Sequence, residues 1–194
     1  NILLAAGLYQ ETVSVEEQFS VIQTRIVDLS TGLFVEVEDA NAFDQRKAAK
    51  DPATSIALDG KTDIAKISRR ENQAVVYIVE SDSEFDKIIL PVHGYGLWST
   101  LYGFVALESD LNTIAGLGFY DHGETPGLGG EIDNPRWKAF WPGKQVYKDG
   151  AVAIEVIKGS VMSGSANASY QVDGLSGATL TSRGVSNLLT FWMG

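Results

Sequence analysis

The sequence predicts an α+β domain whose sheet is mainly antiparallel and flanked by helices. Four β-rich runs follow one another with short intervening segments, at 74–80, 87–92, 101–108 and 112–120. Helical patterns lie before and after these runs, which favours antiparallel pairing over the strand–helix alternation of a parallel sheet. A length of 194 residues suits one domain, and a hydrophobic content of 44% is sufficient for a packed core.

The first element is predicted within an abrupt apolar start, "NILLAAGLY", which lacks the basic segment of a signal peptide. Two interpretations fit it: a short buried helix or strand, or the remnant of an N-terminal membrane anchor whose beginning is missing. We expect residues 1–10 to be that remnant and residues 11–194 to form a single domain.

A helix is predicted over residues 15–28. Ser14 and Glu17 have the spacing of a capping box, in which the serine side chain accepts from the helix backbone. The apolar residues that follow recur with a helical period: Val15, Phe19, Ile22, Ile26 and Val27. Farther along, 34–38 resembles a strand, and 42–51 resembles a solvated helix whose basic residues form no binding patch.

Loops and turns are predicted between the central strands. The acidic segment 81–86 is turn-like, 93–100 is a glycine-aromatic loop, and 109–112 closes a hairpin. A second glycine-rich loop spans 122–132 and precedes a short helix at 134–141. A strand at 151–157 and a C-terminal helix complete the chain, and the helix has an apolar stripe formed by Leu180, Val185, Leu188, Leu189 and Trp192.

The composition excludes several classes of function. Twenty-five acidic against fifteen basic residues give a net charge of −10, which disfavours binding to nucleic acid. The absence of cysteine excludes disulfides, thiolate metal sites and cysteine nucleophiles. His93 and His122 are the only histidines, so one chain cannot form a three-histidine metal site. Both lie beside glycine loops, where a role as hydrogen-bonding structural residues is favoured over a catalytic one.

The stretch "DGLSGATLTSRG" places small and hydroxyl-bearing residues at the start of the C-terminal helix. Free N–H groups and the helix dipole favour an anion there, and small residues let the backbone approach it. The alternative is an ordinary serine or threonine cap. The residues that carry this motif are Asp173, Ser176, Gly177, Ala178 and Thr179, and whether Thr181 and Ser182 cap the helix or hold a phosphate stays open.

Asp173-x-x-Ser176-Gly177-Ala178-Thr179 resembles the recognition motif of bacterial flavin transferases. Together with "NILLAAGLY", "HGYGLWS" and "HGETPGLG", in this order, it resembles the C subunit of the Na⁺-translocating NADH:quinone oxidoreductase across nearly the whole chain. The flavin subunit of the Rnf electron-transport complex shares the FMN-binding domain. The start "NILLAAGL" and the end "NLLTFW" favour the first of these two families.

This resemblance implies a covalent FMN, linked by its phosphate to the Thr179 hydroxyl. A flavin transferase would form the bond from FAD with a divalent cation, since nothing beside Thr179 resembles a built-in base. The chain would relay one electron at a time between other subunits of a membrane redox complex, with no turnover of its own. It would be anchored in the bacterial inner membrane with its soluble domain on the periplasmic side.

The resemblance also implies roles for the two glycine-rich loops. The first would place Gly96, Trp98 and Ser99 beside the flavin ring, although a core aromatic is an equally good interpretation of Trp98. The second would contribute Glu124, Thr125, Leu128 and Gly129, although a plain surface loop also fits. Asp121 and Glu124 could bind a cation, but two carboxylates in such a loop are usually solvated.

Two other classes of protein are compatible with the same residues. One is a freestanding oxidoreductase that binds FMN without a covalent bond. The other is an assembly module in which the small-residue turn only begins a helix. A serine hydrolase is excluded because "GLSGA" does not have the G-x-S-x-G spacing of a nucleophile elbow.

Overall fold

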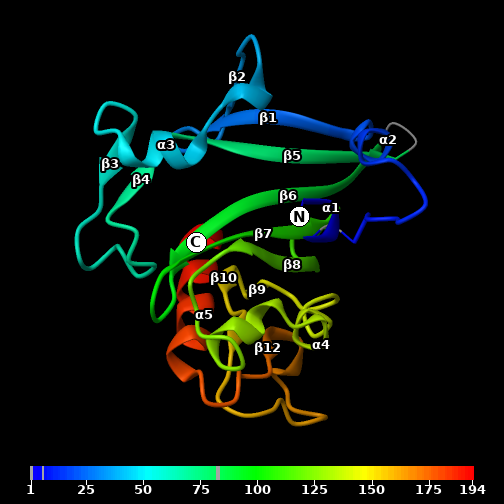
Figure 1. The fold of residues 1–194 in the computed structure, drawn as a ribbon, viewed down its shortest axis with the longest axis vertical. Helices are drawn as coiled ribbons and strands as arrows, with labels where there is room; N and C mark the ends of the chain where they lie inside the picture. Colours follow the sequence, from blue (N-terminus) through cyan, green and yellow to red (C-terminus); the bar gives the residue numbers. More distant parts are fainter. Residues whose placement is uncertain (1, 6, 82–83) are drawn as a thin grey trace.

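The computed structural model describes residues 2–5, 7–81 and 84–194, and its main feature is one antiparallel sheet. The strand order is β2-β1-β5-β6-β7-β8, and each neighbouring pair is antiparallel (Figure 1). The strands span Ile22–Asp28 (β1), Phe34–Val35 (β2), Gln73–Ser81 (β5), Glu84–Tyr95 (β6), Thr100–Glu108 (β7) and Ile114–Asp121 (β8). The predicted α+β class and antiparallel sheet are confirmed.

One face of the sheet forms the main core with α5 (Thr179–Met193). Side chains alternate between the two faces of the sheet, and residues 103–107 of β7 are all buried because both faces are covered there. Figure 1 shows α5 crossing the sheet near the ends of β6 and β7. Strand and helix meet through fully buried side chains, among them Leu101, Val105, Val185, Leu188 and Leu189.

The opposite face holds a smaller core closed by α1 (Ile2–Ala5). Ala5 packs with Ile89, Phe104 and Ala106, which point away from α5. A Cβ on Gly116 would lie 2.2 Å from the Ala5 carbonyl oxygen, so only glycine permits this approach. No helix among residues 2–5, 7–81 and 84–194 combines the length and the apolar character needed to cross a bilayer.

Short elements surround the sheet. Beside β5 lies α3 (Gln45–Lys50), which also contacts the pair β3 (Ser55–Ala57) and β4 (Arg69–Glu71). Below β8 in Figure 1 lie α4 (Pro135–Lys138), β9 (Tyr147–Lys148), β10 (Ala151–Val152), β11 (Glu155–Val156) and β12 (Gln171–Val172). Three 3₁₀ turns span Ala40–Ala42, Gly129–Asp133 and Ala168–Tyr170.

The predicted helix over 15–28 is wrong beyond its first turn. The capping serine is confirmed, because Ser14 accepts from the Glu17 N–H at 3.2 Å, but α2 spans only Val15–Phe19. Residues 22–28 form β1, which pairs in unbroken register with β5. They are rich in β-branched side chains, and their alternation buries Ile26. Pairing with a long neighbouring strand therefore prevails over a spacing that also fits a helix.

Smaller differences concern element ends. Residues predicted as the loop 93–100 begin as the end of β6, so the turn itself is 96–99. The predicted strand 151–157 divides into β10 and β11, which belong to different small sheets. Leu180 is half-exposed and does not belong to the buried stripe of α5. Of the predicted turn 81–86, residues 82–83 lie outside the described residues, as do residues 1 and 6 of the expected anchor remnant.

Candidate functional site

The start of α5 lacks a side-chain cap. Ala178 occupies the N-cap position, and no side chain accepts from the first turn, so the interpretation as an ordinary serine or threonine cap is wrong. Among the described residues, the N–H groups of Thr179, Leu180 and Thr181 have no hydrogen-bond partner. The Thr179 side chain is exposed beside them. A hydroxyl and three free donors thus share the positive end of a fifteen-residue helix.

The turn that leads into α5 is held from behind by polar contacts. The Ser182 hydroxyl accepts from the Leu175 N–H at 3.1 Å, and Gly177 has a φ of +71°, a conformation that favours glycine. The carboxylate of Asp173 accepts from the Val161 N–H at 2.8 Å, and its carbonyl accepts from the Trp137 indole at 2.8 Å. Asp173 therefore fixes the segment that leads into the motif.

A buried carboxylate joins the two glycine-rich loops to α5. Glu124 is only 5% exposed, which contradicts the expectation of a solvated loop carboxylate. Its Oε1 accepts from the N–H groups of Leu97, Trp98 and Ser99 at 3.1, 2.9 and 3.3 Å. Its Oε2 accepts from the Thr181 hydroxyl at 2.6 Å. The loop at 96–99, the loop at 123–129 and the helix start thus meet at one side chain.

The environment of Glu124 favours its charged form. Burial by itself raises the pKa of this carboxyl group, but the hydrogen bonds from the Thr181 hydroxyl and three backbone N–H groups outweigh it. The pKa of Glu124 consequently lies below its usual value. A charged carboxylate can therefore hold the loops together at neutral pH.

Two glycines make room for Glu124. A Cβ on Gly96 would lie 2.7 Å from its Oε1, and a Cβ on Gly129 would lie 2.7 Å from its Oε2 and 2.5 Å from the Thr181 hydroxyl. In the helix, a Cβ on Gly184 would lie 2.6 Å from the Tyr95 carbonyl oxygen. The loops and the helix can therefore approach this closely only because these positions are glycine.

Large apolar side chains are exposed on the two glycine-rich loops. Trp98 is 66% exposed, so its interpretation as a core aromatic is wrong, and Leu128 is 45% exposed. The Leu128 side chain lies 3.0 Å from the position that a Cβ on Gly177 would take. An exposed tryptophan and leucine beside the start of α5 offer flat apolar surface to a ring system.

Hydrogen bonds fix the second loop at its beginning. Ser99 accepts from the Gly123 N–H at 2.6 Å. His122 Nδ1 accepts from the Glu124 N–H at 3.1 Å, while Nε2 lies 2.8 Å from an Asp133 carboxylate oxygen. The tautomer with its proton on Nε2 satisfies both contacts. His122 is thus a structural hydrogen-bonding residue, as its position beside the loop predicts.

A cavity of about 260 Å³ adjoins the Thr179 side of the helix start. Lys158 and Arg183 line it together with Thr179. Neither cation was predicted from the sequence, because they lie 21 residues before and four residues after Thr179 in an acidic chain. Arg183 could have been predicted, because a residue four positions after Thr179 lies on the same face of the helix.

Most of the predicted site residues therefore fall into two groups. Gly96, Ser99, Glu124, Gly129 and Thr181 form the junction around the buried Glu124 side chain, with the Thr181 hydroxyl directed at Glu124 and not at solvent. Ser176, Gly177, Thr179, Trp98 and Leu128 form the exposed surface, and Ala178 is buried between. Thr125 contributes its carbonyl oxygen to the loop, while its side chain is exposed. No group of three potential metal ligands occurs among the described residues.

Comparison with known proteins connects this geometry to a family. A model of the FMN-binding domain matches residues 96–194, which begin at the first loop and include both the second loop and α5. The chain is 57% identical to the C subunit of the Na⁺-translocating NADH-quinone reductase of Pseudomonas aeruginosa, covering all of the chain and 76% of that protein. It is 52% identical to the same subunit of Vibrio anguillarum, covering all of the chain and 74% of that protein.

Two solved structures share the fold. The crystal structure of NqrC from Shewanella oneidensis superposes with a TM-score of 0.90 at 39% identity, covering all of this chain and 88% of the other. The C subunit of the Na⁺-translocating NADH-quinone reductase from Parabacteroides distasonis gives 0.73 at 32% identity, covering 97% of this chain and 83% of the other.

Proposed function

Since the chain belongs to the family of the C subunit of the Na⁺-translocating NADH-quinone reductase, we propose that it is an electron carrier with FMN attached covalently to Thr179. Family membership makes the chain a subunit of a multisubunit reductase and gives it an FMN-binding domain. The site of attachment, the nature of the bond and the electron relay are the further steps of the proposal.

The observation that supports attachment at Thr179 is its exposed hydroxyl at an uncapped helix start. A phosphate esterified to this hydroxyl lies within reach of the free N–H groups of Thr179, Leu180 and Thr181, which favour an anion. Lys158 and Arg183 line the adjoining cavity and add positive charge. Nearby hydroxyls are less suitable, because those of Thr181 and Ser182 are buried and hydrogen-bonded.

The chemistry of attachment requires a separate enzyme. The Thr179 oxygen would bond to the phosphorus of the FMN half of FAD, AMP would leave, and the hydroxyl proton would be lost. Among the described residues, no side chain accepts a hydrogen bond from Thr179 and none is therefore placed as a base. This arrangement supports maturation by a flavin transferase, whose substrate is the exposed turn.

The exposed surface beside Thr179 is the place for the flavin ring. Trp98 and Leu128 lie on separate loops, and both loops are fixed by Glu124 through hydrogen bonds. FMN supplies reversible electron transfer when it is bound, and the protein orients its ring and adjusts its potential by burial and hydrogen bonding. A flavin ring bound with one edge exposed suits electron transfer to and from neighbouring subunits.

The proposal extends to the location of the domain. We place it at the periplasmic side of the bacterial inner membrane, anchored through an N-terminal helix, with one-electron exchange inside the complex and no turnover by this subunit alone. Membership of a membrane reductase family supports this placement. A test is labelling of a cysteine introduced at exposed Glu80 in intact cells by a reagent that does not cross the inner membrane.

Intact mass under denaturing conditions tests the covalent bond. Coexpression with the flavin transferase should add one FMN minus water to the chain, and Thr179→Ala should abolish the addition while leaving the circular dichroism spectrum unchanged. Thr190→Ala is the matched control, since it removes an exposed threonine hydroxyl from the same helix outside the motif. Flavin that washes away on denaturation would identify a non-covalent flavoprotein, and a chain that binds no flavin would support an assembly module.

A further inference from the structure

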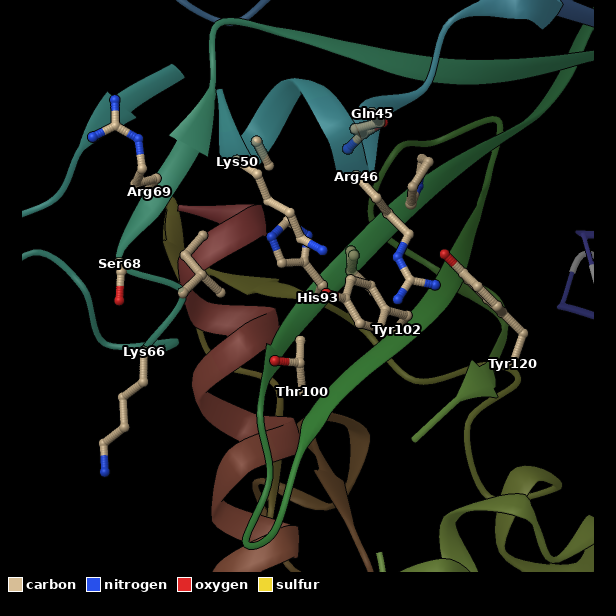
Figure 2. Close-up of a pocket in the computed structure, with 14 residues that line it drawn as sticks. Gln45, Arg46, Lys50, Lys66, Ser68, Arg69, His93, Thr100, Tyr102 and Tyr120 are labelled. Atoms are coloured by element: carbon tan, nitrogen blue, oxygen red, sulfur yellow. The ribbon is translucent and has the colours of Figure 1, made fainter. Parts of the chain in front are cut away.

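A second cavity, of about 300 Å³, lies near the C-terminal end of α5, the end opposite Thr179 (Figure 2). Its floor is the end of β6 and the start of β7, and its walls are α3 and the segment that enters β4. His93 on the floor contacts Trp192 near the C-terminal end of α5, with ring centroids 5.0 Å apart. Because Thr179 begins this helix, the cavity lies about 20 Å along it from Thr179.

The cavity gathers cations in an acidic protein. Arg46, Lys50, Lys66 and Arg69 line it, whereas no aspartate or glutamate among the described residues does so. The chain as a whole has a net charge of −10. Such a local excess of one sign, in a hollow with protein walls, concentrates the electrostatic potential and attracts ions of the opposite sign.

Two of these cations are already fixed, and two are free. Arg46 lies over the Tyr102 ring at 3.6 Å and pairs with Asp121 at 2.8 Å, so its guanidinium is held in place. Arg69 donates to the Ser55 hydroxyl and carbonyl at 2.8 and 2.9 Å. Among residues 2–5, 7–81 and 84–194, the Lys50 and Lys66 ammonium groups have neither an ion-pair nor a hydrogen-bond partner.

The wall opposite α3 is held in an unusual backbone conformation. Lys66 and Ser68 have φ values of +54° and +65°, which cost roughly 1–2 kcal/mol each for residues other than glycine. The Asp63 carboxylate accepts from the Ile67 and Ser68 N–H groups, both at 2.8 Å, and maintains this shape. The structure thus maintains a strained segment that places Lys66, Ser68 and Arg69 at the cavity.

Figure 2 shows Arg46 and Lys50 extending from α3 toward His93 and Tyr102, with Thr100 on the same floor. Burial, with a smaller contribution from Arg46, lowers the pKa of His93 to about 4, so its ring is neutral at neutral pH. Pro91, Val92, Ile67 and the aromatic rings make the remaining surface apolar. The cavity therefore offers a charged side for an anion and an apolar side for its substituent.

We propose that this cavity binds a phosphate group, held by Lys50 and the fixed guanidinium of Arg46, while Lys66, which points away from them in Figure 2, adds positive charge at the rim. A phosphate carries more charge than a carboxylate and presents several acceptor oxygens, which suits an ammonium and a guanidinium donor that extend from the same helix over one floor. The phosphate belongs either to a free small molecule or to the headgroup of an anionic lipid. This site is separate from the proposed flavin site and does not depend on it.

Binding of inorganic phosphate to the whole chain in 0.15 M NaCl tests the proposal, with the His93 ring followed by NMR. We expect a saturable shift with a dissociation constant of about 1 mM or tighter. Lys50→Gln/Lys66→Gln should weaken binding by about tenfold or more. Bound phosphate should also raise the pKa of His93, because a nearby negative charge favours its protonated form.

Two controls separate this site from other sources of anion binding. Lys47→Gln/Lys61→Gln removes the same charge outside the cavity and should leave the affinity unchanged. Thr179→Ala should also bind phosphate normally. Equal losses in both double variants, loss in Thr179→Ala, or no saturable shift up to about 20 mM phosphate together with no vesicle binding would overturn the proposal.

Sedimentation with vesicles distinguishes the source of the phosphate. Phosphatidylcholine vesicles with and without phosphatidylglycerol are compared, using the wild-type chain and Lys50→Gln/Lys66→Gln. Binding that requires phosphatidylglycerol and the two lysines identifies a lipid headgroup. Binding of free phosphate without vesicle binding identifies a small-molecule site.

Discussion

The N-terminal end of α5 meets two loops that are joined by a buried carboxylate, whereas its C-terminal end packs beside a neutral histidine below a cluster of cations. At the first end Glu124 accepts four hydrogen bonds, and Thr179 stays exposed. At the second end the Trp192 indole donates to the His93 carbonyl at 2.7 Å. One helix therefore joins the loop junction beside exposed Thr179 to a separate cavity that is lined by cations.

This difference shows how an acidic chain can offer two places to anions. At the start of α5 the attraction comes from unpaired backbone N–H groups, and the buried charge of Glu124 is directed toward the loops. At the far end it comes from side chains on α3 and the strained segment before β4. Substitutions at one end should therefore leave the other unchanged.

The largest effect is expected from Glu124→Ala. Four donors would lose their acceptor, and two loops would lose their connection to α5, so the free energy of unfolding should fall by about 3 kcal/mol or more. Urea unfolding measures this change, with Glu80→Ala at an exposed carboxylate as the control. An equal and small change in the two variants would contradict the role assigned to Glu124.

Acid should weaken the same junction. The pKa of Glu124 is lowered in the folded chain, so the unfolded chain takes up the proton first as the pH falls below the usual value of 4.5. Its contribution to stability is complete above that pH and is lost as the pH falls through the folded pKa. The free energy of unfolding should be measured from pH 6 to pH 3. Below about pH 4.5 it should decrease less steeply with falling pH in Glu124→Gln than in the wild type.

A glycine pair provides a sharper comparison within the second loop. Gly129→Ala would place a methyl group against Glu124 and Thr181 and should cost about 2 kcal/mol of unfolding free energy. Gly123→Ala would meet Ser99 at 3.4 Å, an ordinary contact, and should cost less than about 1 kcal/mol. Urea unfolding measures both, and the reverse order would show that the packing around Glu124 is not the determining feature.

At the other end of α5, His93 gives a different pH dependence. Its pKa is about 4 in the folded chain and 6.5 without burial, so the unfolded chain binds the proton first. Stability from this residue is complete above pH 6.5 and decreases as the pH falls toward 4. In His93→Gln, the free energy of unfolding measured with urea should decrease less between pH 6.5 and pH 4 than in the wild type.

The smallest effect on stability is expected for the exposed apolar pair. Trp98→Ala and Leu128→Ala should each change the free energy of unfolding by less than about 1 kcal/mol, since the Trp98 side chain is largely exposed and that of Leu128 nearly half exposed. In the flavinylated chain they should shift the absorption spectrum or the reduction potential without removing the flavin. An unchanged spectrum and potential in both variants would show that the ring lies elsewhere.

The predictive value of the sequence differs between these regions. The four central strands and the helix start at Thr179 were predicted because alternation and small-residue turns are local signals. The helix predicted over 15–28 failed because the register with β5 is a long-range interaction that a local period does not contain. Burial of Glu124 could not be predicted either, since its partners lie 25–57 residues away.

The second cavity could not be predicted from local sequence patterns either. Arg46 and Lys50 fit a solvated helical face in the sequence, and only the fold places them opposite Lys66 and above His93. That interpretation was incomplete, because Arg46 stacks on Tyr102 and pairs with Asp121, 75 residues away. Resemblance to a family supplied the chemistry of Thr179, and the structure supplied the reason why this hydroxyl is accessible while that of Thr181 is not.

Fragmentation of one tryptic peptide tests the central claim most directly. Residues 159–183 lie between the cleavage sites after Lys158 and Arg183 and contain every hydroxyl of the motif up to Ser182. In the chain matured with its transferase, we expect the mass of FMN minus water on Thr179 and no added mass on Ser176, Thr181 or Ser182. An addition on any of those three, or none on this peptide, would contradict the account.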